Sequence, residues 1–235
     1  MSLQLVIFDV DGLLLDTERV WQEVWRDVAE AYHMRELGED LFRRVIGISG
    51  RRVREILAES LKGRCDPKEF LERARGEGLR RLETQLRVKP GVFDILSYIR
   101  QRGIFCAVAT STCRVLTEER LRRMGLYDRF DYICCGDEIE RGKPYPDIYL
   151  NTLRKMNVGP DRALVFEDSW AGVEAAYRAG VPCVMVPDLL PATERERQRV
   201  KRIIPSLKQG YRIIDEMICE DTENRSCIEG EMYNG

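Results

Sequence analysis

Two aspartates near the N-terminus, Asp9 and Asp11, are the residues of this chain best suited to do chemistry. They directly follow the apolar run Leu5–Phe8, lie two positions apart and are followed by Gly12. A buried strand that ends in this way delivers carboxylates to the edge where an open α/β sheet keeps its ligand crevice. Because two carboxylates this close repel each other, they need a divalent cation or a shared proton. The pair therefore predicts a metal-assisted reaction centre.

A plain turn or a calcium-binding loop could also produce this segment. Asp-x-Asp-Gly is common in turns, since Asp caps its own backbone and Gly accepts a positive φ. A calcium-binding loop also begins with spaced aspartates and a glycine. The calcium loop is excluded because its fifth and twelfth positions would fall on Leu13 and Val20, and because a strand precedes it. For the pair taken alone, the plain turn stays an alternative.

Polar residues also follow three further predicted strands. They are Ser111 and Thr112 after Ile104–Ala109, Lys143 in the region after Tyr132–Cys134, and Glu167 with Asp168 after Ala163–Phe166. Each could serve merely as a helix cap, a solvated charge or an acid at a helix start. In a parallel sheet, however, the carboxyl ends of the strands share one edge. Four such segments on one rim favour a functional site.

The composition of this rim suits phosphoryl transfer to a carboxylate. A phosphate dianion has to approach a carboxylate, and two like unit charges about 4 Å apart repel each other by about 4 kcal/mol at an effective dielectric constant of about 20. The ammonium of Lys143 and a Mg²⁺ ion held by acidic oxygens would offset that repulsion. Hard oxygen ligands without soft ones favour magnesium over zinc. The only histidine, His33, lies near a predicted helix end, so catalysis has to proceed without imidazole.

The elements that hold the rim alternate along the chain. Strands at Leu3–Phe8, Ile104–Ala109, Tyr132–Cys134, Ala163–Phe166 and Cys183–Val186 are separated by helices at Thr112–Met124, Pro146–Met156 and Trp170–Ala179. Short apolar strands alternating with helices predict an α/β fold, a Rossmann-like parallel sheet core with helices on both faces.

Between the first two strands lies a charge-rich stretch without a convincing strand. Apolar residues recur at helical spacing from Val20 to Ala31, and further helices are predicted over Glu39–Val45, Gly50–Lys62 and Pro67–Leu86. Pro90 suits the first turn of the helix that follows. The predicted domains are therefore a core of residues 1–16 and 89–217, an inserted helical cap of residues 17–88, and an acidic tail, 218–235, without fixed structure.

The bulk composition excludes several classes of protein. The chain has 235 residues, with 38 basic and 40 acidic side chains, so its net charge gives no case for nucleic-acid binding. No apolar stretch approaches the ~20 residues of a membrane span, and the N-terminus has no secretory signal. Eight cysteines are scattered without metal-binding spacing and predict reduced thiols. We expect a cytoplasmic enzyme with a small-molecule partner.

The four polar segments, in this order, resemble the motifs of the haloacid dehalogenase superfamily. The matching residues are Asp9–Gly12 with Asp16 and Thr17, then Ser111, then Lys143 with Pro144, and last Glu167–Ser169 with Gly172. The resemblance extends from about Leu3 to Pro187. The inserted helices resemble the small α-helical cap of the subfamily that contains β-phosphoglucomutase and many sugar-phosphate phosphatases.

The resemblance implies a role for each matching residue. Asp9 would be the nucleophile that forms an aspartyl-phosphate, and Asp11 would protonate the leaving oxygen and then activate water. Ser111 and Lys143 would hold the phosphoryl group, with Thr112 beside them. The implied magnesium ligands are Asp9, Asp11 through its backbone carbonyl, Asp168, and Glu167 either directly or one layer further out. Because a dehalogenase has no need of Asp11, this aspartate favours phosphate chemistry.

The cap positions favour a phosphatase over a mutase. The mutase branch carries a histidine soon after the Asp-Thr pair and a lysine before the glycine of a cap loop, where this chain has Trp21 and Ile46. The cap residues expected to meet the substrate are Gly47, Arg51 and Trp21, although packing inside the cap also accounts for the tryptophan. The leading expectation is a Mg²⁺-dependent phosphatase of a small phosphorylated metabolite, with a sugar phosphate favoured. A sugar phosphomutase and a non-catalytic protein that binds a phosphorylated ligand are the alternatives.

Overall fold

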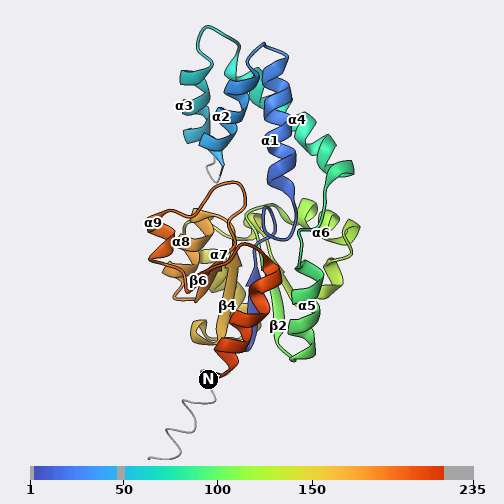
Figure 1. Ribbon diagram of the computed structural model, residues 1–235, viewed down its shortest axis with the longest axis vertical. Helices are drawn as coiled ribbons and strands as arrows, with labels where there is room; N and C mark the ends of the chain where they lie inside the picture. Colours follow the sequence, from blue (N-terminus) through green and yellow to red (C-terminus); the bar gives the residue numbers. More distant parts are fainter. Residues whose placement is uncertain (1–2, 47–50, 220–235) are drawn as a thin grey trace, which may run out of the picture. The chain divides into compact units, whose positions relative to one another are not determined.

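Residues 3–46 and 51–219 are described by the structure, a computed structural model, and they fall into two compact units (Figure 1). Of the described residues, the first unit contains 3–14, 89–187 and 192–219. The second contains 15–46, 51–88 and 188–191. The second unit therefore interrupts the first in sequence, and it includes the described part of the predicted helical segment 17–88.

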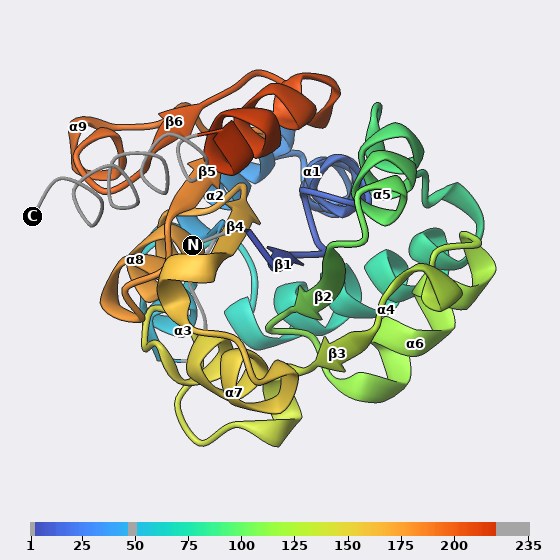
Figure 2. The same ribbon diagram turned by 90° about the horizontal axis from the view of Figure 1, so that it is seen from below.

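A six-stranded parallel sheet forms the centre of the first unit (Figure 2). Its strands are β1 (Leu5–Phe8), β2 (Phe105–Ala109), β3 (Tyr132–Cys134), β4 (Ala163–Glu167), β5 (Cys183–Met185) and β6 (Arg202–Ile203). They lie in the order β3-β2-β1-β4-β5-β6, and all neighbouring pairs are parallel. All four residues of β1 are buried, which explains a continuous apolar run without alternation. The sheet confirms the predicted fold class.

Helices cover both faces of this sheet. The helices of the unit are α5 (Val92–Gln101), α6 (Arg114–Arg123), α7 (Asp147–Met156), α8 (Trp170–Arg178), α9 (Glu194–Arg197) and residues 210–219, with 3-10 turns η1 (Tyr127–Arg129), η2 (Gly136–Glu138), η3 (Pro160–Arg162) and η4 (Leu207–Gln209). In Figure 2, α7 and α8 lie on one side of the sheet, and α5 and the helix 210–219 lie on the other. Tyr149 and Val173 share a core with Ile7 on the first side. On the second side, Gly210 approaches Ile95 and Phe166.

Three details of this unit differ from the sequence expectations. The short elements α9 and β6 were not predicted, because four and two largely polar residues carry no periodic signal. Pro90 does not open α5: the helix begins at Val92, and Gly91, with φ of 89°, is its N-cap. Residues 218 and 219, assigned by sequence to the acidic tail, continue the last helix. The rest of that predicted tail, 220–235, lies outside the described residues.

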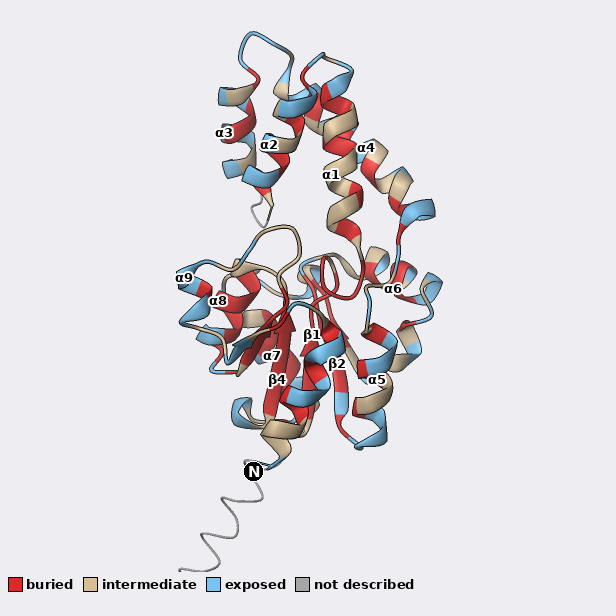
Figure 3. Cartoon of the chain, viewed as in Figure 1, coloured by how far each residue is buried: buried red, intermediate tan, exposed pale blue. Residues whose placement is uncertain are grey.

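The described part of the second unit consists of four helices around an apolar core. They are α1 (Thr17–Glu30), α2 (Arg35–Val45), α3 (Arg51–Ser60) and α4 (Pro67–Gln85). The ring of Trp25 lies at the centre, 5.8 Å from that of Phe42 and 5.5 Å from that of Phe70 between centroids. Leu189, distant in sequence, also packs against this core. Figure 3 shows the buried residues along the inner faces of these helices, as the spacing in α1 predicts.

Candidate active site

Lys143 joins the ends of three neighbouring strands in the first unit. Its Nζ donates hydrogen bonds to Asp9 Oδ1 at 2.7 Å, to the backbone oxygen of Ala109 at 3.0 Å, and to Glu167 Oε1 at 2.5 Å. Those residues stand at the carboxyl ends of β1, β2 and β4. The lysine side chain is 5% exposed. Three sequence-predicted site residues thus form one buried ion cluster.

Glu167 has both of its oxygens engaged. Oε1 accepts from Lys143 and from the hydroxyl of Tyr149 at 2.8 Å. Oε2 accepts from the amides of Asp168 and Ser169, at 3.1 and 3.2 Å, and from the Ser169 hydroxyl at 3.0 Å. Because every bond fixes the carboxylate further, Glu167 orients Lys143 from a fully buried position. Its predicted role as a magnesium ligand stays a prediction.

The surroundings of Asp9 make the charged form of its carboxyl unfavourable. The pKa of Asp9 is raised from its ordinary value of 3.8 to about 7, chiefly because the carboxyl is buried; Lys143 acts to lower this pKa, and Glu167 and Asp11 add to the rise. Burial alone would lower the pKa of Lys143, but Asp9 and Glu167 raise it above its ordinary value, so the ammonium stays charged. One lysine therefore does not fully compensate the carboxylates at this edge of the sheet.

Asp11 lies beyond the end of β1 and is held by two side chains from the segment after β2. Thr112 Oγ1 donates to Asp11 Oδ2 at 2.6 Å, and Arg120 Nη1 donates to Asp11 Oδ1 at 3.1 Å. Gly12, with φ of 84°, allows the chain to turn immediately after this aspartate. Thr112, predicted to bind substrate, is thus in contact with the predicted general acid.

Ser111 lies on the exposed loop that follows β2. A Cβ at Gly136 would fall 2.2 Å from the backbone oxygen of Ser111, so the loop after β3 supports this segment closely. The amide of Gly136 also donates to the carbonyl of Thr112 at 3.0 Å. The backbone around Ser111 is therefore fixed while its side chain stays accessible.

The cap residues predicted to meet substrate belong to the second unit. Trp21 is half-buried and packs on Gly78, where a Cβ would fall 1.9 Å from the indole ring. Arg51 is exposed and pairs with Glu55 at 2.7 Å. Gly47 lies outside the described residues. Substrate contacts of Trp21, Gly47 and Arg51 stay predictions, and packing inside the cap accounts for the observed surroundings of Trp21.

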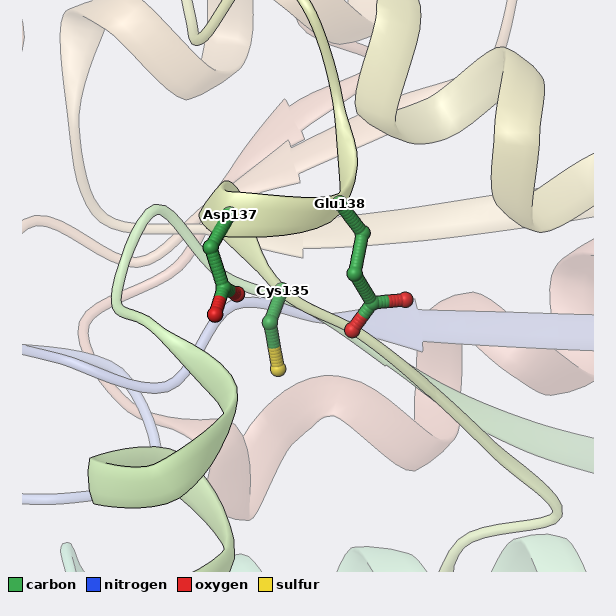
Figure 4. Close-up of side chains that lie close together, drawn as sticks. All are labelled: Cys135, Asp137 and Glu138. Atoms are coloured by element: carbon green, nitrogen blue, oxygen red, sulfur yellow. The ribbon is translucent and has the colours of Figure 1, made fainter.

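A second group of potential metal ligands lies at the start of η2. Figure 4 shows Cys135, Asp137 and Glu138, whose ligand atoms lie within 4.8 Å of one another. Arg114 already occupies both carboxylates: its amide donates to Asp137 and its guanidinium to Glu138. Burial raises the pKa of the Cys135 thiol to about 11, which keeps it protonated. This cluster is therefore a turn whose two carboxylates are both hydrogen-bonded to Arg114. The seven cysteines in the described part of the chain are free thiols, as expected.

Sequence reasoning missed two residues of the site, Tyr149 and Arg120, and gave no contact for a third, Gly172. Tyr149 lies on the buried face of α7, Gly172 contacts the carboxylate of Glu167, and Arg120 lies on α6. Gly172 was noted only as part of a motif. Arg120 stands among charged residues that suggest an exposed helix face, yet Thr117 and Leu121 on the same side are buried. The position of Arg120 relative to Thr117 and Leu121 on the helix was the one sequence signal that could have indicated its burial.

Known proteins resemble this chain in sequence. The sequence model of the haloacid dehalogenase-like hydrolases matches residues 6–186. A phosphorylated carbohydrates phosphatase of Thermotoga maritima is 42% identical over 213 residues, which are 91% of each chain. The fructose-1-phosphate phosphatase YqaB of Escherichia coli is 31% identical over 77% of this chain and 95% of its own.

Solved structures agree with these sequence matches. A provisionally named β-phosphoglucomutase of Thermotoga maritima superposes with a TM-score of 0.74 at 36% identity, over 91% of this chain and 99% of its own. The protein CbbY of Rhodobacter sphaeroides, solved with phosphate, has a TM-score of 0.68 at 27% identity, over 88% and 96% of the two chains.

The chain belongs to the haloacid dehalogenase-like hydrolases. Together with its phosphatase relatives, this makes it an enzyme of the phosphoric monoester hydrolase class. Phosphatases of this superfamily generally use a divalent metal ion. Within the described residues, no helix is long and apolar enough to cross a membrane.

Proposed function

We propose that this enzyme is a Mg²⁺-dependent phosphatase of a small phosphorylated metabolite, with sugar phosphates as the leading class. The observation that carries the proposal is the bridge from Lys143 to Asp9 and Glu167, with Asp11 two residues beyond Asp9. The named activities of the Thermotoga maritima and Escherichia coli relatives favour phosphorylated carbohydrates as substrates. A cytoplasmic location is part of the same proposal.

The proposed reaction has two steps at Asp9. First, a carboxylate oxygen of Asp9 attacks phosphorus, the ester P–O bond breaks, and the leaving oxygen takes a proton from Asp11. Second, water attacks the phosphorus of the aspartyl-phosphate while Asp11 accepts a proton from that water. The Asp9 carboxylate is regenerated and inorganic phosphate leaves. Lys143 and Ser111 hold the phosphoryl oxygens in both steps.

The donor set fits a magnesium ion. Three carboxylates, those of Asp9, Asp11 and Glu167, pair with two cations, Lys143 and Arg120, and Asp168 directly follows Glu167 in the chain. Acidic groups therefore outnumber the basic groups at this edge of the sheet. All donors are oxygens, which suit magnesium. When bound, the ion would neutralise charge on the transferring phosphoryl group.

The residues proposed to hold this ion are Asp9, Asp168 and the backbone carbonyl of Asp11. Glu167 is proposed to support the site one layer further out, because both of its oxygens already accept hydrogen bonds. This arrangement leaves Asp11 free to act through its side chain.

A sugar phosphomutase is the second candidate, since the Thermotoga maritima structure at 36% identity carries that provisional name. Trp21 and Ile46 stand where the mutase branch has a histidine and a lysine, and this weighs against it. Conversion of a hexose 1-phosphate to its 6-phosphate without release of phosphate would establish the mutase.

The proposal is tested by a panel of sugar phosphates and other phosphorylated metabolites, with Mg²⁺ and with a chelator. We expect phosphate release that requires the metal and is abolished in Asp9→Asn. The matched control is Asp128→Asn, an exposed aspartate outside the site, which should keep full activity. After acid quenching, the phosphoryl group should be found on the peptide that contains Asp9. Full activity of Asp9→Asn would refute the covalent mechanism.

A further inference from the structure

Arg120 is a buried cation beside Asp11 that lies outside the four sequence motifs. Its side chain is 8% exposed, and its Nη1 donates to Asp11 Oδ1 at 3.1 Å. Arg120 and Asp11 are 109 positions apart in sequence. The contact therefore depends on the placement of α6 against the loop that follows β1.

The other arginines of α6 behave differently. Arg122 and Arg123 pair with glutamates four residues earlier on the same helix, and their side chains are 54% and 30% exposed. Such surface pairs contribute little to stability. Among the residues that the structure describes, Asp11 is the carboxylate that pairs with Arg120. Burying a guanidinium is costly unless it is paired and hydrogen-bonded, so the position of Arg120 depends on this carboxylate.

We propose that Arg120 is the positioning residue of the general acid–base Asp11, a proposal that rests on the phosphatase function above. A guanidinium can only donate hydrogen bonds, so Oδ1 of Asp11 is always an acceptor. The transferable proton therefore resides on Oδ2. The hydroxyl of Thr112, 2.6 Å from Oδ2, can donate to that oxygen or accept from it, and so it fits both protonation states.

This arrangement defines one proton path for both steps. In the first step, the proton on Oδ2 passes to the leaving oxygen as the P–O bond breaks. In the second step, Oδ2 takes a proton from the attacking water. Arg120 keeps the carboxylate plane fixed throughout. Ser111 and Thr112 lie on the loop that leads into α6, so the same segment holds the phosphate and orients the acid–base.

The test compares two leaving groups. An alkoxide from a sugar phosphate needs protonation as it departs, whereas p-nitrophenolate from p-nitrophenyl phosphate needs little. We expect Arg120→Met to lower kcat/KM for the sugar phosphate by about a hundredfold, the low end of general acid–base effects. For p-nitrophenyl phosphate we expect a loss smaller by at least tenfold. Because kcat/KM reports the step that releases the alcohol, slow hydrolysis of the intermediate does not mask the difference.

Matched variants keep the proposal falsifiable. Arg123→Met on the same helix is the control and should change neither value. Arg120→Lys keeps the charge and should restore part of the sugar phosphate activity. Thr112→Val removes the hydroxyl from the other oxygen of Asp11, and it should show the same leaving-group dependence if Arg120→Met does not fold.

The outcomes separate the two proposals. Equal losses for both leaving groups, or activity like that of Arg123→Met, would overturn the positioning role and leave the phosphatase function standing. A wild-type enzyme that releases phosphate from neither substrate would overturn the phosphatase function itself.

Discussion

Gly172 touches the carboxylate of Glu167: a Cβ on residue 172 would fall 1.8 Å from Oε1. The hydroxyl of Ser169, which caps α8 by accepting from the amide of Gly172, also donates to Glu167. The first turn of α8 therefore packs directly on the group that orients Lys143. Only glycine at position 172 leaves room for Glu167 in the position from which it binds Lys143.

Gly172→Ala should displace Glu167 and weaken the cluster. We expect a loss of about 1–3 kcal/mol in the free energy of unfolding, typical of overpacking, together with a lower kcat. Urea unfolding and steady-state kinetics measure the two effects. The control is Gly76→Ala in α4, where no atom lies within 4 Å of the new Cβ and helix propensity predicts a slight gain in stability. Unchanged stability in Gly172→Ala would contradict the close contact.

Tyr149→Phe removes the buried hydroxyl that donates to Glu167. Loss of one hydrogen bond to a buried carboxylate should cost about 1–3 kcal/mol of stability. Since Lys143 still holds Oε1, we expect most of the activity to remain. Tyr145→Phe is the control, because Tyr145 is exposed and lies two residues before the start of α7. A variant with wild-type stability in urea unfolding would show that the hydroxyl contributes nothing.

The raised pKa of Asp9 predicts competition between protons and the metal. Below about pH 7, Asp9 of the metal-free enzyme carries a proton that has to leave before the ion binds. The Mg²⁺ concentration for half-maximal activity should therefore rise as the pH falls below about 7, by up to about tenfold per pH unit, and should level off above it. Mg²⁺ titrations of activity across that range measure the trend. A pH-independent requirement would contradict it.

The same pKa gives the sign of the metal-free stability. The pKa of Asp9 is higher in the folded enzyme than its ordinary value of 3.8, which applies to the unfolded chain. The folded enzyme therefore binds this proton more tightly, and protonation of Asp9 stabilises the fold. Raising the pH from about 4 to about 7 should therefore destabilise the metal-free enzyme at this site. The stabilisation by Mg²⁺ in thermal unfolding should be largest above about pH 7.

Glu77 should stabilise the second unit in a pH-dependent way. Hydrogen bonds from Arg80 and Arg81 lower the pKa of Glu77 to about 2, and Arg81 also donates to Asp27 of α1 at 2.7 Å. Glu77→Gln should cost about 0.5–1 kcal/mol at neutral pH, because the pair is partly exposed. The difference from wild type should shrink as the pH falls from the ordinary value of 4.5 toward about 2.

Urea unfolding at several pH values measures this difference. Glu83→Gln, at an exposed position of the same helix, is the control and should show no such trend. A constant difference between Glu77→Gln and wild type across the acid range would refute the stabilisation by ion pairs.

Strand ends could be predicted from the sequence, and contacts between elements could not. The apolar runs before Asp9 and Glu167 indicate where β1 and β4 stop, and a parallel sheet then brings their ends together. Tyr149 was missed because a tyrosine on an amphipathic helix gives no sign of its hydroxyl's partner. Arg120 was missed because its partner lies 109 positions away. Such partners depend on how helices pack on the sheet, which periodicity does not specify.

The three hydrogen bonds of Lys143 give this residue a structural role that Ser111 lacks. Lys143 closes the ends of β1, β2 and β4, so its removal would leave two buried carboxylates without their counter-ion. A substitution there impairs folding and chemistry together, and its effect on turnover has no simple interpretation. Ser111, exposed on its loop, carries no such structural duty. Inactive enzyme that is still well folded, of the kind needed to trap a bound substrate, is therefore better sought at residue 111 than at residue 143.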